Sequence, residues 1–198
     1  ALSATAVALA LSACGNKTRD VVITEDDGTV TIGVVDNFTN HTHGIRVEET
    51  VVDEYSEANV ISYDRVTFKT YATVNTMLDL VESEDPEVIN LSSANTNIIT
   101  ERHNGSDIYS SRQLWENDVI VVAASGNEGQ YGASVSRESI FQLSVGATDT
   151  VGNIASYSNY HPKIVDFYAL GKSAPYTFEY EGNEYEWQSN GTSFATPR

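Results

Sequence analysis

Apolar and polar residues follow two different periods along this chain, which together predict alternating strands and helices. Short runs of apolar and β-branched residues predict buried strands, and apolar residues spaced three or four apart predict amphipathic helices. The expected strands are Val30–Val35, Val60–Phe68, Val88–Ser92, Val119–Ala124 and Ile140–Ala147, with a further apolar run at Ile164–Leu170. The expected helices are Gly44–Tyr55, Ala72–Glu82 and Asp107–Glu116, and Tyr176–Trp187 is compatible with a hairpin turning at Glu181–Asn183. This alternation predicts an α/β fold with an open parallel sheet covered by helices.

Polar residues gather just beyond the expected strands. Asp36 follows the first strand, and Ser92 closes the strand that begins at Val88. Asn127 lies in a glycine-rich turn after the most apolar strand. In open α/β sheets functional groups gather beyond the carboxyl ends of the strands, so this edge is where we expect a site.

Length and charge limit the classes of protein that fit. The chain has 198 residues, 40% of them hydrophobic, which is enough for one substantial core and favours a single domain over residues 21–198. Eleven basic residues against 28 acidic ones give a net charge of −17. Such a surface repels phosphate backbones and anionic headgroups, which argues against a nucleic-acid partner.

The beginning of the chain predicts export. Residues 1–13 are uncharged and apolar or small, too short to span a membrane, and resemble the remnant of an export signal. The sequence Leu11-Ser12-Ala13-Cys14 resembles the lipoprotein box of bacterial lipoproteins. That resemblance implies a lipid on Cys14, a tether over residues 14–20, and an exported protein that meets the membrane of the cell envelope only through this anchor. The alternative is a structural cysteine behind an ordinary signal.

Four residues match the needs of a serine nucleophile. Such a serine requires a base, an acid that orients the base, and donors for an oxyanion. Ser193, His43, Asp36 and Asn127 are candidates for these roles. Taken singly, Asp36 could form a turn or a cap, Asn127 could be a turn residue with positive φ, and His41 is a rival base. His41 and His43 stand two positions apart, point apart on a helix, and have no second ligand cluster, so we expect no metal and no cofactor.

The segment Asn190–Pro197, NGTSFATP, resembles the nucleophile motif of the subtilisin-like serine proteases, also called subtilases or peptidase family S8. The order acid, histidine, serine is also theirs. Val121–Gly129 resembles their oxyanion-hole segment, and Val88–Ser93 resembles the strand that lines their substrate cleft. With Phe141–Asp149 and Ala155–Ser158, the resemblance extends from about Thr29 to Arg198.

The resemblance implies a subtilisin-like three-layer fold, with a central parallel sheet and helices on both faces, and a monomeric serine endopeptidase that hydrolyses peptide bonds in proteins. It implies that Ser193 attacks the scissile carbonyl, that His43 is the general base, and that Asp36 orients His43. Asn127 and the Ser193 N–H would bind the oxyanion. The residues implied to flank a protein or peptide substrate are Ser92, Ser93, Ala94, Ala124, Ser125 and Gly126.

The chain departs from the family pattern around the acid and the base. The family continues its histidine as Gly-Thr-His-Val, whereas His43 is followed by Gly-Ile-Arg-Val, and Asp36 precedes Asn-Phe rather than Ser/Thr-Gly. Asp36 and His43 stand only seven positions apart, which removes a stretch where relatives often build a calcium site. The alternative is therefore a surface lipoprotein of the same fold that binds peptides or partner proteins without cleaving them. Only residues 194–198 follow the serine, where relatives have a long buried helix, so we expect the C-terminal part of the domain to be missing.

Overall fold

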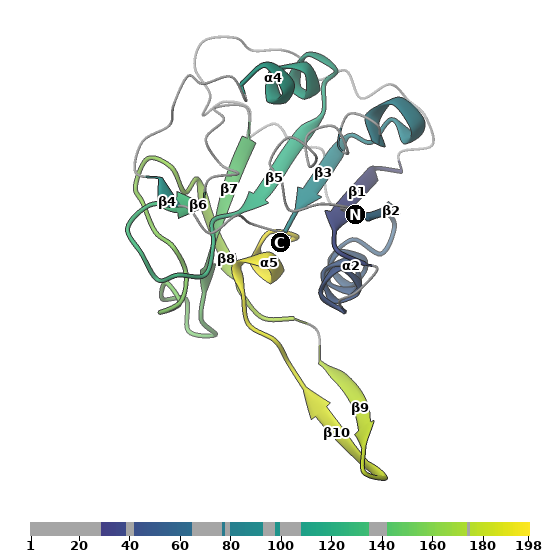
Figure 1. Cartoon of the computed structure of the whole chain (residues 1–198), viewed down its shortest axis with the longest axis vertical. Helices are drawn as coiled ribbons and strands as arrows, with labels where there is room; N and C mark the ends of the chain where they lie inside the picture. Colours follow the sequence, from purple (N-terminus) through teal and green to yellow (C-terminus); the bar gives the residue numbers. More distant parts are fainter. Residues whose placement is uncertain are drawn as a thin grey trace.

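A parallel six-stranded sheet forms the centre of the computed structural model, which describes residues 29–38, 42–64, 77, 80–92, 98–99, 108–134, 142–173 and 175–198 (Figure 1). The strand order is β2-β1-β3-β5-β7-β8, and every neighbouring pair is parallel. The strands are β1 (Thr31–Asp36), β2 (Asn59–Asp64), β3 (Val88–Leu91), β5 (Ile120–Ala124), β7 (Gln142–Thr148) and β8 (Phe167–Leu170). The predicted α/β class is confirmed.

The strand order places a topological switch beside β1. From β1 the chain runs to β2 on one side, and it then returns to β3 on the other side. Ligand sites of open α/β sheets lie at such switches, beyond the carboxyl ends of the strands. Asp36 ends β1, and Ser92 directly follows β3, whose Leu91 is paired with Val35. The two predicted site residues therefore lie side by side at this edge.

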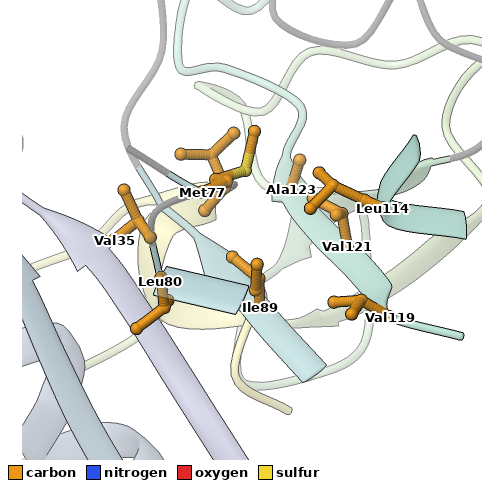
Figure 2. Packing of buried hydrophobic residues seen from close by; sticks show 9 residues of the cluster. Val35, Met77, Leu80, Ile89, Leu114, Val119, Val121 and Ala123 are labelled. Atoms are coloured by element: carbon orange, nitrogen blue, oxygen red, sulfur yellow. The ribbon is translucent and has the colours of Figure 1, made fainter. Parts of the chain in front are cut away.

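Side chains of β1 alternate between two apolar clusters, because successive residues of a strand point to opposite faces. On one face lies the cluster of Figure 2, which comprises Val35, Met77, Leu80, Ile89, Leu91, Leu114, Val119, Val121 and Ala123. On the other face, Ile32 and Val34 pack with Val47, Val51 and Phe194.

Helices cover both faces of the sheet, as expected. Val47 and Val51 belong to α2 (His43–Glu54), and Phe194 belongs to the short helix α5 (Thr192–Ala195). The opposite face is covered by α4 (Ile108–Glu116) and by a helical segment at residues 80–84. The remainder of the predicted helix Ala72–Glu82, apart from Met77, lies outside the described residues. So does the predicted end of the second strand, beyond Asp64.

Two smaller sheets accompany the central one. The predicted hairpin is present as β9 (Tyr176–Tyr180) and β10 (Asn183–Trp187), and it projects away from the sheet in Figure 1. The short pair β4 (Ile98–Ile99) and β6 (Ala133–Ser134) was not predicted, since two-residue strands leave no periodic pattern. Within the part of the chain that the structure describes, no helix is long and apolar enough to cross a membrane.

Candidate active site

The predicted acid and base form a close pair. His43 Nδ1 lies 3.0 Å from each carboxylate oxygen of Asp36. Asp36 is 1% exposed, and its Oδ1 also accepts the Asn37 N–H at 2.7 Å. The side chain of His43 is 38% exposed. With Nδ1 directed at a buried carboxylate, the Nε2 edge of the ring is left for a second partner, which is the arrangement a general base requires.

Gly44 makes the short connection between acid and base possible. A Cβ atom on Gly44 would lie 2.9 Å from the Asn37 carbonyl oxygen and 3.0 Å from the Phe38 ring, so only glycine lets α2 approach the loop this closely. The Phe38 N–H donates to Asp64 Oδ1 at 3.0 Å, which holds the same loop from the other side. Asp64 was not predicted to be part of the site. Its register pairing with Asp36 on the neighbouring strand brings it there.

The candidate nucleophile lies at the start of α5 and is 5% exposed. The Ser193 hydroxyl donates to the Ser92 carbonyl at 2.8 Å, and the Ser92 hydroxyl donates to the Ser193 carbonyl at 2.9 Å. The Ser193 hydroxyl is therefore directed at β3 rather than at His43. The ring of Phe194, the next residue, lies 5.8 Å from the His43 ring, centroid to centroid. Catalytic hydrogen bonds of serine hydrolases often form only when substrate is bound, so this orientation is compatible with catalysis.

Asn127 is connected to the nucleophile through Thr192. Its Oδ1 accepts the Thr192 N–H at 2.8 Å and the Thr192 hydroxyl at 3.0 Å. Because Thr192 occupies the side-chain oxygen of Asn127, the side-chain nitrogen is the group left to donate to another partner. The positive-φ residues of this turn are Gly126 at 105° and Gly129 at 64°, and Asn127 is not among them. The geometry therefore favours a side-chain role for Asn127 over a turn-forming one.

A buried asparagine, which was not predicted, supports this loop from behind. Asn159 is fully buried and donates to the Ser125 carbonyl at 3.0 Å and to a Glu128 carboxylate oxygen at 2.5 Å. Its own side-chain oxygen accepts the Gln130 N–H at 3.0 Å. One amide thus fixes the backbone on both sides of Asn127. This role was not predicted because Asn159 lies far from Asn127 in the sequence.

The predicted substrate-flanking side chains that the structure describes point into the protein. Ser92, Ala124 and Ser125 are at most 2% exposed. Gly126 donates its N–H to the Thr192 hydroxyl at 3.2 Å and accepts the Asn159 N–H. These residues therefore form the packed back of the site.

Other predicted positions lie outside the described residues, namely Cys14, His41, Ser93 and Ala94. Among the described residues, no group of three or more His, Cys, Asp or Glu side chains is placed to hold a metal ion.

Comparison with known proteins identifies relatives of this chain. The family described as Peptidase S8, the subtilase family, matches residues 28–198. Subtilisin BL of Lederbergia lenta is 43% identical over 79 residues, which is 40% of this chain and 28% of that protein. The cell wall-associated protease of Bacillus subtilis (strain 168) is 38% identical over 80 residues, 40% of this chain and 8% of that protein. The matched segments thus span well under two thirds of these relatives.

Solved structures share the fold at lower identity. The Patellamide maturation protease PatA superposes with a TM-score of 0.67 at 19% identity, over 85% of this chain and 74% of that one. A cold adapted subtilisin-like serine proteinase gives a TM-score of 0.62 at 18% identity, over 88% of this chain and 74% of that one.

Proposed function

Because this chain belongs to the subtilase family, we propose that the protein is a serine endopeptidase that hydrolyses peptide bonds in proteins. Two contacts support the proposal beyond the family match. The buried Asp36 carboxylate holds His43 at 3.0 Å despite the seven-residue spacing. Asn127 is held by Thr192, directly before Ser193, at 2.8 Å. These contacts support the proposed roles of Asp36 as acid, His43 as base, Asn127 as oxyanion donor and Ser193 as nucleophile.

In the proposed reaction, the Ser193 hydroxyl leaves the Ser92 carbonyl and gives its proton to His43 Nε2 as Oγ attacks the scissile carbonyl carbon. The carbonyl oxygen becomes an oxyanion, which accepts hydrogen bonds from the Asn127 amide and the Ser193 N–H. His43 then donates the proton to the leaving amine, and the acyl-enzyme forms. Water attacks this ester through the same groups and releases the second product. Asp36 remains ionised throughout and stabilises the imidazolium of His43.

The Ser193 N–H is suited to this role because it lies in the first turn of α5. First-turn N–H groups of a helix have no acceptor within that helix. The Thr192 N–H before it is already bound by Asn127. The same contact thus fixes the Thr192 N–H, and we assign the neighbouring Ser193 N–H to the oxyanion.

We further propose that the substrate is a protein or peptide chain bound in extended form and that the enzyme acts as a monomer outside the cytoplasm, tethered through a lipid on Cys14. The export-like segment 1–13 and the sequence Leu11–Cys14 support the location. Metabolic labelling with a palmitate analogue tests the anchor: label that is lost in Cys14→Ala supports it, and label retained in that variant contradicts it.

The function is tested by hydrolysis of a fluorescent casein by the natural protein that carries this chain. We expect activity in the wild type and in Ser189→Ala, a control serine four positions before the nucleophile. Ser193→Ala should be inactive. Equal activity in Ser193→Ala would assign the hydrolysis to another group and refute the proposal.

A further inference from the structure

The nucleophile begins a helix that cannot complete its own hydrogen bonds. In an α-helix the carbonyl of each residue accepts the N–H four positions later. For Thr192 this bond is present, with the Thr196 N–H as donor at 3.0 Å. For Ser193 the residue four positions later is Pro197, which has no N–H. The Ser193 carbonyl therefore needs a donor from elsewhere, since the residue is buried.

Ser92 supplies that donor. Its hydroxyl, 2% exposed, donates to the Ser193 carbonyl at 2.9 Å. At the same time the Ser92 carbonyl accepts the Ser193 hydroxyl at 2.8 Å. Ser92 thus contacts the nucleophile residue at both its backbone and its side chain. The hydrogen bond from the Ser92 hydroxyl to the Ser193 carbonyl does not involve the reacting hydroxyl, so it can persist when Ser193 attacks.

Asn90 fixes the direction of the Ser92 hydroxyl. It lies in the middle of β3, paired with Val34 and Val122 of the neighbouring strands, and is 3% exposed. Its amide nitrogen donates to Ser92 Oγ at 2.9 Å. A donor on that side leaves the Ser92 proton free to point at the Ser193 carbonyl. Ser92 directly follows β3, two positions after Asn90, and the contacts from Asn90 to Ser92 and from Ser92 to Ser193 place both side chains on the side of β3 that faces α5.

Stability alone does not account for an asparagine at this place. Among the described residues, Asn90 Oδ1 is one of the buried oxygens with no hydrogen-bond partner. A buried amide that is only half satisfied costs free energy, and a branched apolar residue would suit a central parallel strand better. An asparagine at this position is explained if its amide orients the Ser92 hydroxyl.

We propose that Asn90 and Ser92 are positioning residues, whose side chains form a chain from β3 to the Ser193 carbonyl and replace the helical hydrogen bond that Pro197 cannot make. This inference rests on the proposed function, because what it explains is the placement of the nucleophile. Neither residue touches the reacting atoms through its side chain. They act by holding the first turn of α5 against β3, and with it the Ser193 N–H.

The test compares variants of the natural protein that carries this chain. Ser92→Ala removes the donor, and Pro197→Ala restores a backbone N–H four positions after Ser193. Thr196 already has helical angles of φ −59° and ψ −39°, so the new N–H points back toward Ser193. Ser144→Ala is the matched control, because Ser144 is an equally buried serine on β7 whose hydroxyl has no partner among the described residues.

We expect Ser92→Ala to lower kcat about tenfold, as leaving a buried carbonyl unpaired would do, with KM unchanged within about twofold. The pH profile of kcat should not move, since Asp36 and His43 are untouched. Asn90→Leu should lower kcat by about threefold. Pro197→Ala should recover most of the loss in the Ser92→Ala background, and Ser144→Ala should be neutral.

Two results would overturn the inference while leaving the proposed function intact. One is unchanged kcat in Ser92→Ala with only lower thermal stability, which would indicate a purely structural role. The other is a kcat loss that Pro197→Ala does not relieve. If the wild type hydrolyses nothing, the function fails, and the wild type, Ser92→Ala, Pro197→Ala and the double variant are then compared by urea unfolding. Ser92→Ala must destabilise less in the Pro197→Ala background, and additive effects would refute the hydrogen-bond replacement.

Discussion

Replacing Gly44 by alanine tests whether the close approach of α2 to the loop after β1 is what brings His43 to Asp36. The added Cβ would lie 2.9 Å from the Asn37 carbonyl oxygen and 3.0 Å from the Phe38 ring. Neither neighbour can withdraw easily, since the first is backbone and the Phe38 N–H is bound to Asp64. We therefore expect the helix itself to move away from the loop.

The size of the effect follows from two opposing contributions. Alanine in a helix gains up to about 1 kcal/mol over glycine, and crowding a packed site costs about 1–3 kcal/mol. The net result should be a loss of about 1 kcal/mol. Relieving the contact requires a shift of about 0.5 Å. Added to the 3.0 Å between His43 Nδ1 and Asp36, such a shift takes the pair to the limit of a hydrogen bond. Since 1 Å of misplacement can cost about 10²-fold in rate, we expect about a tenfold loss of kcat.

The assay measures the free energy of unfolding in urea and kcat for a peptide substrate in parallel. Asp53→Ala is the control, because Asp53 is exposed on the same helix and reports the gain from alanine without crowding. Both the stability and the rate should fall for Gly44→Ala and not for the control. If Gly44→Ala is stabilising by the amount that helix propensity predicts, and its kcat equals that of the wild type, then the contact does not hold the pair together.

Three further variants test separate contacts. Asn127→Asp keeps the side-chain oxygen that accepts from Thr192 but loses the amide donor. We expect kcat to fall about 10²–10³-fold, which is the size known for the oxyanion asparagine of subtilisin itself, with little change in Tm. Arg46→Met removes the guanidinium that lies 3.7 Å from the centre of the Tyr176 ring, so the free energy of unfolding in urea should fall by about 0.5–1 kcal/mol. An unchanged urea midpoint would show that this contact does not stabilise the protein. Burial raises the pKa of the Tyr157 phenol, so its contribution to stability is present below its unfolded pKa of about 10 and is lost as pH rises through the folded pKa. Tyr157→Phe loses the hydrogen bond that the phenol donates to the Gly171 carbonyl at 2.7 Å, so it should be less stable than the wild type at pH 8. Because it lacks the ionising phenol, it should also show a shallower decline of stability between pH 10 and 12, and equal slopes would contradict this.

The strands and helices were predictable because each has a local pattern. The continuous apolar run that gave β5 and the helical spacing of Val47 and Val51 are readable over a few residues. Ser193 and Asn127 could be proposed as site residues because their motifs are compact in sequence. Asp36 and His43 followed from their order and from a position at the end of a strand and the start of a helix.

The contacts that connect these residues were not predictable in the same way. Asp64 reaches the loop after Asp36 because β2 pairs with β1 in one particular register. Ser92 was expected to flank the substrate, whereas its side chain turns inward to a residue 101 positions away. Asn159 reaches the backbone carbonyl of Ser125, close to Asn127, across 34 positions. Such contacts depend on which strands become neighbours, and no local pattern encodes that.

The most direct test of the account is covalent labelling of the natural protein with a fluorophosphonate, followed by mass spectrometry of the intact protein and of its peptides. We expect one adduct per chain, located on Ser193, with labelling abolished in Ser193→Ala and slowed strongly in His43→Ala. A folded wild type that forms no adduct, or an adduct on another serine that survives Ser193→Ala, would contradict the assignment of Ser193 as the nucleophile.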